Sequence, residues 1–147
     1  MSHWRLGPLT AVVAVLVSCS ATPKAADRAT LEASATAHIL AIPPPRPEKY
    51  RGTIDMKGWR NPYLVIRKDG VGLLDVANSE QRLMKPEDLI PALAQLPGSA
   101  WPYGRVVAVT QTGLTSPGDA VLIRKNRAIV AGALESMQVL IHWVPSV

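Results

Sequence analysis

The dipeptide Asp69-Gly70 lies between two apolar runs and constrains the fold of this chain more than any other feature. The runs Tyr63–Arg67 and Val71–Asp75 are rich in Leu, Val and Ile. A tight hairpin turn requires positive φ, which glycine tolerates, so Asp-Gly at this position predicts two antiparallel strands. The chain therefore contains a sheet.

Four further elements are expected C-terminal to this hairpin, two helices and two strands. The acidic Glu87-Asp88 favours the start of a short helix, and Ser116-Pro117 supplies an N-cap and a first-turn proline for a longer one. The two strands are short, apolar and rich in β-branched residues. In chain order the expected elements are a helix over Leu89–Leu96, a strand over Arg105–Gln111, a helix from Pro117 to Met137 and a strand over Val139–Val144.

The longer helix has one apolar face, interrupted by a single polar residue. At 100° per residue the apolar positions fall together and the charged ones fall outside them. Asn126 lies within this stripe, where a buried amide needs a partner. We expect it to bond a backbone group, or the face to meet something polar there. The apolar positions are Leu122, Ile123, Ile129, Val130, Ala133, Leu134 and Met137.

The order of these elements is β-β-α-β-α-β, which predicts an α+β fold. We expect a two-layer α/β sandwich, with a four-stranded mixed sheet and two helices on one face. This order, with the Asp-Gly hairpin and the Gly-Arg-Val-Val-Ala-Val strand at 104–109, resembles the periplasmic domain of the ExbD/TolR biopolymer-transport family. The resemblance implies a domain that binds a protein partner or the cell wall.

The N-terminus has the pattern of a signal peptide. A basic start, Met1–Arg5, precedes the uncharged run Leu6–Val17. As a helix these twelve residues would span about 18 Å, against about 30 Å for a bilayer core, so no permanent span is expected. The run also lacks the length and the acidic residue of the ExbD/TolR transmembrane helix, so a motor role is not expected.

The segment Leu16-Val17-Ser18-Cys19 resembles the lipobox of bacterial lipoproteins. The resemblance implies cleavage of residues 1–18 as a signal peptide and acylation of Cys19, by palmitate-like chains, as a membrane anchor. The protein would then lie in the cell envelope, facing the periplasm or exterior, and Ser20 slightly favours the outer membrane. Ordinary secretion and an uncleaved anchor are the alternatives.

Residues 19–61 are expected to form an Ala- and Pro-rich tether, and residues 62–147 one small domain. Thr30–Ile42 could form a weak helix, and Pro43–Pro47 an extended spacer. The stretch from Arg46 to Lys68 holds seven basic residues and two acidic ones, net +5. It could lie against anionic headgroups or be a solvated linker. Nucleic acid is not an expected partner, since no binding motif accompanies the charge.

The sequence carries no recognisable catalytic or cofactor-binding set. Cys19 is the one cysteine, and His142 is the only histidine in the expected domain. No zinc, phosphate-loop or dinucleotide motif occurs, so neither metal nor cofactor is expected. Glu87 and Asp88 are interpreted as helix-start residues. A hydrolase would require a cleft that contains His142 with an acid beside it.

Two clusters of rings and arginines precede predicted strands and are candidate binding surfaces. Neighbouring strands would bring the clusters together at one end of the sheet. Aromatics with Arg are typical binding anchors, although the rings could instead cap a core that lacks Phe. Open sheet edges offer a second route, since an extended partner can add to them. The cluster residues are Trp59, Arg60 and Tyr63 in the first, and Trp101, Tyr103 and Arg105 in the second.

The leading hypothesis is therefore a non-catalytic envelope lipoprotein whose small domain binds a protein partner. The alternative is a lipoprotein that binds the cell wall or a glycan through the Trp, Tyr and Arg clusters. A hydrolase is the third hypothesis.

Overall fold

The computed structural model describes residues 23–53, 56–75, 80–113 and 116–145. The leader and the lipobox Leu16–Cys19 lie outside these residues. Four short 3₁₀ turns, η1 to η4, connect the main elements: Pro47–Lys49, Met56–Gly58, Pro86–Asp88 and Gly98–Ala100. The helices and strands in the described residues are α1 (Pro23–Ala41), β1 (Tyr63–Arg67), β2 (Gly70–Asp75), β3 (Glu80–Met84), α2 (Leu89–Ala94), β4 (Val106–Gln111), α3 (Pro117–Ser136) and β5 (Leu140–Trp143).

The strands form one mixed sheet in the order β3-β2-β1-β4-β5. β1 pairs antiparallel with β2 and parallel with β4, and β5 pairs parallel with β4. The predicted α+β class and mixed sheet are confirmed, but the predicted count of four strands is wrong. The missed strand, β3, pairs antiparallel with β2 at one edge. Its sequence Glu-Gln-Arg-Leu-Met is mostly polar, because an edge strand needs few apolar residues.

The predicted hairpin joins β1 to β2. Arg67 pairs with Gly70, so the loop is the two residues Lys68 and Asp69. Gly70 has φ of +147°, and a Cβ there would overlap the backbone carbonyl of Met84. Only glycine therefore fits where β2 lies against β3. The Arg67 guanidinium donates to Asp69 across the turn at 3.0 Å and lowers the pKa of that carboxyl.

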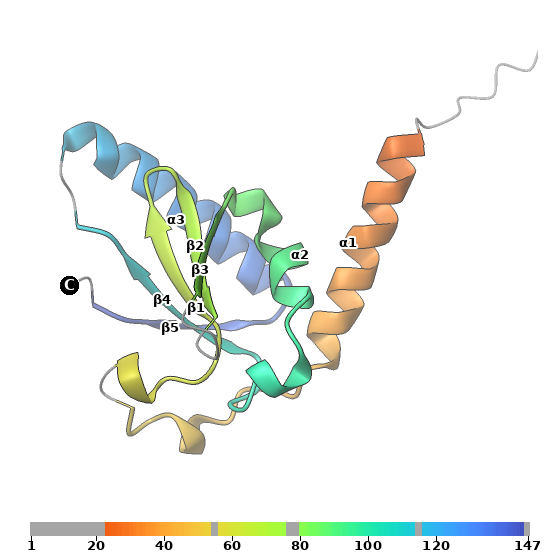
Figure 1. Cartoon of the computed structure of the whole chain (residues 1–147), viewed down its shortest axis with the longest axis horizontal. Helices are drawn as coiled ribbons and strands as arrows, with labels where there is room; N and C mark the ends of the chain where they lie inside the picture. Colours follow the sequence, from red (N-terminus) through yellow and green to blue (C-terminus); the bar gives the residue numbers. More distant parts are fainter. Residues whose placement is uncertain (1–22, 54–55, 76–79, 114–115, 146–147) are drawn as a thin grey trace, which may run out of the picture.

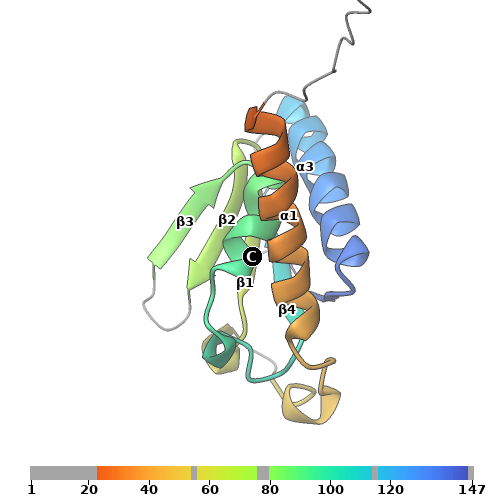
Figure 2. The ribbon, with the colours of Figure 1, turned by 90° about the vertical axis from the view of Figure 1, so that its right-hand side faces the viewer.

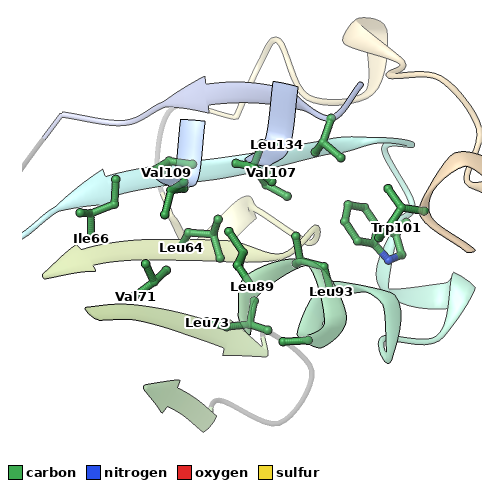
Figure 3. Close-up of a cluster of buried hydrophobic side chains, with 14 of the residues drawn as sticks. Leu64, Ile66, Val71, Leu73, Leu89, Leu93, Trp101, Val107, Val109 and Leu134 are labelled. Carbon is green, nitrogen blue, oxygen red and sulfur yellow. The ribbon is translucent and has the colours of Figure 1, made fainter. Parts of the chain in front are cut away.

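The main core lies between the sheet and helices α2 and α3 (Figure 3). Alternate residues of the strands point into it, as period-two side-chain geometry requires. Leu64, Val107 and Leu89 are fully buried there. In Figure 2, strands β1 to β3 lie to the left and helices α1 and α3 to the right.

The longer helix, α3, largely follows its sequence pattern. The Ser116 hydroxyl accepts a hydrogen bond from the Asp119 N–H at 3.1 Å, as an N-cap. Ile123 and Val130 are buried, but Leu122, predicted on the same face, is 46% exposed. Asn126 donates to the carbonyl of Arg67 at 2.7 Å. The expected backbone partner for this amide is thus confirmed.

The expected boundary between tether and domain at residue 61 does not match the packing. Ile39 and Ile42 are buried in the main core, and α1 lies against α2 (Figures 1 and 2). Pro43–Pro47 was expected to form a spacer, but it contacts the domain. The Arg105 N–H donates a hydrogen bond to the Pro43 carbonyl at 2.8 Å. The sequence offers little indication of this face, because the apolar residues of α1 are mostly alanines; the large buried side chains are Ile39 and, directly after the helix, Ile42.

Candidate functional site

The two predicted aromatic clusters meet at one end of the sheet, as expected, because β1 and β4 are neighbours. The Trp59 and Tyr103 ring centroids lie 5.3 Å apart, edge to face. However, Trp59, Tyr63, Trp101 and Tyr103 are each less than 10% exposed. These rings belong to the interior, so they do not form the open binding surface that was predicted.

The two arginines of these clusters lie nearer to solvent. Arg60 is exposed and Arg105 is half-buried. Among the described residues, the Nε atom of Arg105 and the indole nitrogen of Trp101 are buried without a hydrogen-bond partner. Trp101 packs in the main core, whereas Tyr103 belongs to a second cluster on the other side of the sheet. The predicted surface is thus divided between two cores.

Asn61 connects the two clusters, and the sequence reasoning missed it. Its amide is fully buried and donates to the carbonyls of Gly104 at 2.8 Å and Val106 at 2.7 Å. Its carbonyl oxygen accepts from the Tyr103 N–H at 2.9 Å. Every polar group of the Asn61 side chain is therefore hydrogen-bonded. These bonds hold the start of β1 against the start of β4.

His142 lies in the second cluster, with its ring stacked on Trp59 at 5.2 Å and 8°. Tyr50 packs edge-on against it at 5.9 Å. Within the described residues no hydrogen bond or ion pair joins His142 to a carboxylate, which a hydrolytic dyad would need. Nearby, burial raises the pKa of the Tyr63 phenol, against the opposing effect of its hydrogen bond to Thr110.

No group of three His, Cys, Asp or Glu side chains in the described residues could hold a metal ion. Nor does any helix among those residues have the length and hydropathy to cross a membrane.

The open edge formed by β5 is the strongest candidate for a binding site. The Leu140 N–H donates to the Arg105 carbonyl at 2.9 Å, and the Val144 N–H donates to the Val109 carbonyl at 2.8 Å. Both N–H groups are thus directed toward β4. In a parallel strand the direction alternates from residue to residue. The backbone N–H and C=O groups of Ile141 and Trp143 are therefore directed away from β4, along the edge.

A shallow groove of about 540 Å³ runs beside this edge. Its lining is mainly apolar and comes from β5, the end of α3 and Pro45. Trp143 is 42% exposed, and the Arg127 guanidinium lies 4.1 Å from its ring centroid. This cation–π contact holds the indole at the rim of the groove.

The α3–β5 turn fixes the position of this edge. Gln138 has a φ of +55°. Its N–H donates to the Glu135 carbonyl at 2.9 Å, and the Val139 N–H donates to the Leu134 carbonyl at 2.9 Å. These two bonds define a Schellman motif, with Val139 packed in the same core as Leu134. The helix therefore ends rigidly, and β5 begins at once.

The two sheet edges differ in a way that favours β5. Natural edges are often protected by charged side chains, which discourage pairing with another chain. The β3 edge has exposed Arg82, with exposed Lys85 directly after the strand. β5 reads Leu-Ile-His-Trp and has neither lysine, arginine nor acid. Its exposed residues are the apolar Leu140 and Trp143.

A second groove, of about 620 Å³, lies between α1 and α2. Arg28, Leu31 and His38 line it from α1, and Glu87 and Asp88 from η3. It mixes both signs of charge with an apolar wall. It therefore gives less indication of its occupant than the β5 edge does.

No protein-family model, curated protein or solved structure matches the chain.

Proposed function

We propose that this chain is a non-catalytic cell-envelope lipoprotein whose domain binds an extended segment of a partner protein at the β5 edge. The observation that carries the proposal is the set of outward backbone groups on Ile141 and Trp143, beside a mainly apolar groove and on a strand without charged residues. Added strands gain affinity from main-chain hydrogen bonds and specificity from side-chain pockets. The fitting partner has apolar residues at alternate positions.

The envelope location is part of the same proposal and depends on the sequence. The lipobox would place an acylated Cys19 at the membrane, and the domain would begin four residues later with α1. The proposed two-layer arrangement of sheet and helices resembles that of ExbD/TolR periplasmic domains. We do not propose a motor role for this chain. The glycan-binding alternative loses its original support, because the rings that suggested it are buried.

Site-specific photo-cross-linking in intact cells tests the edge. A photoreactive residue replaces Leu140, which is 48% exposed, and a matched control replaces Leu83 on β3, which is 49% exposed. We expect a discrete product containing a second protein from position 140 and little from position 83. An Ile141→Pro change removes one outward N–H, so it should lower the yield about three- to tenfold.

Two results would contradict this proposal. Equal cross-linking from both positions would mean that the β5 edge has no special affinity. A product from position 140 with twice the mass of this chain would identify the occupant as a second copy. Melting of the Ile141→Pro variant is compared with the original chain, so that loss of binding is distinguished from unfolding.

A further inference from the structure

A group of exposed cations at one end of the domain, which we name the basic end, forms a second candidate surface. It comprises residues of η1, η2 and the turns beside them, all exposed: Arg46, Lys49, Arg51, Lys57 and Arg60. Over 46–60 the sequence places only Glu48 and Asp55 against them. The net charge of this short segment is thus strongly positive.

The basic end is built on a fixed part of the domain. Arg46 N–H donates to Tyr103 at 2.9 Å, and Lys49 Nζ donates to the Pro102 carbonyl at 3.3 Å. Below the cations, Tyr50 and Trp59 are 6% and 2% exposed. Their rings pack edge to face at 5.6 Å. The cations are therefore presented by a folded support, and not by the solvated linker that the sequence allowed.

The basic end lies at the opposite end of the molecule from the start of α1. In Figure 1, η1 and η2 are at the bottom, whereas the Pro23 end of α1 is at the top right, and Figure 2 agrees. The 19 residues of α1 correspond to about 28 Å at 1.5 Å per residue. If Cys19 is anchored, the cations face away from the anchoring membrane.

The chemistry of the surface points to binding without insertion. Among the described residues, none of the large exposed apolar side chains belongs to 43–53 or 57–62. A bilayer-docking surface usually adds apolar insertion to its charge. Arginines instead bind carboxylates and phosphates at the surface through paired hydrogen bonds. The expected contact is therefore polar, superficial and sensitive to salt.

We propose that the basic end binds an anionic cell-wall polymer through its carboxylates or phosphates, so that the domain connects its membrane to the wall. The direction of the contact rests on the proposed lipid anchor, whereas the binding itself does not. It uses a surface distinct from the β5 edge, so one molecule can engage a protein and the polymer together.

Co-sedimentation of the detergent-purified full chain with purified peptidoglycan sacculi tests the proposal. The variant Arg46→Glu/Arg51→Glu/Arg60→Glu reverses three cations that make no side-chain hydrogen bond in the described part of the chain. The matched control reverses three exposed cations elsewhere, Arg82, Arg124 and Lys125, for the same change in charge. Unchanged melting temperatures verify that both variants are folded.

We expect the original chain and the control to sediment with sacculi at low salt, and the basic-end variant to bind at least about tenfold more weakly. Raising the salt to about 0.5 M should release the bound protein. Equal losses in both variants would show that net charge alone is responsible and would overturn the proposal. A basic-end variant that lost binding to phosphatidylglycerol vesicles but kept its binding to sacculi would also overturn it, in favour of a membrane surface.

The outcomes remain distinct from those of the proposed function. The basic-end variant should keep its cross-link from position 140, since β5 is unchanged. Conversely, an unmodified Cys19 would refute the anchor while leaving sacculus binding of the purified chain to be measured.

Discussion

Replacing Asn61 with alanine is expected to lower the free energy of unfolding by about 3–4 kcal/mol, measured by urea denaturation. The change deletes two donors and one acceptor at a fully buried position. The carbonyls of Gly104 and Val106 and the Tyr103 N–H would lose these bonds away from water. Each such loss costs about 1–3 kcal/mol, against a typical total stability of about 5–15 kcal/mol.

Asn126→Ala is the matched control for that change. It also removes a side-chain hydrogen bond, in which the Asn126 amide donates to the Arg67 backbone carbonyl at 2.7 Å. Asn126 is only half-buried, so water can replace the lost partner, and we expect a loss of about 1 kcal/mol. Equal losses in the two variants would mean that Asn61 does not have the structural role assigned to it.

Gly104→Ala is expected to cost about 2–4 kcal/mol. Gly104 has φ of +81°, and a Cβ there would overlap the carbonyls of Pro43 and Pro44. The strain of positive φ adds to this overlap. The overlap should also separate the segment after α1 from the domain. Urea denaturation measures the loss, and faster proteolysis after residue 42 would report the separation.

Gly113→Ala is the control here, because a Cβ at that position meets nothing within 4 Å. We expect its stability to change by less than about 0.5 kcal/mol. If Gly104→Ala behaved in the same way, residues 43–46 would not be packed on the domain. The sequence-based interpretation of this segment as a spacer would then be restored.

Local signals in the sequence were sufficient for most of the second half of the fold. Asp69-Gly70 and Ser116 determine the backbone conformation at their own positions. Together with the residues next to them they therefore identify a hairpin and a helix start, without reference to distant parts of the chain. β3 was missed because its polar residues become a strand only where β2 offers unpaired groups. The attachment of α1 was missed because the helix has no continuous apolar stripe, and its large core residues are only Ile39 and the adjoining Ile42.

The candidate site was less predictable than the fold. The rings were correctly expected to meet, since adjacent parallel strands bring their starting points together. Their burial depends on Tyr50, which the sequence placed in a tether, and on Asn61, which resembles an ordinary pre-proline turn residue. The direction of the β5 backbone groups depends on register, which the residue types of that strand do not specify.

The attachment of lipid to Cys19 is the claim on which the envelope function and the orientation of the domain both depend. Mass spectrometry of the N-terminal peptide from the native protein measures it directly. We expect a peptide that begins at Cys19 and carries acyl chains, and we expect a Cys19→Ser variant to leave the membrane fraction. A native peptide with unmodified Cys19, or one that begins after it, would contradict the proposed anchor.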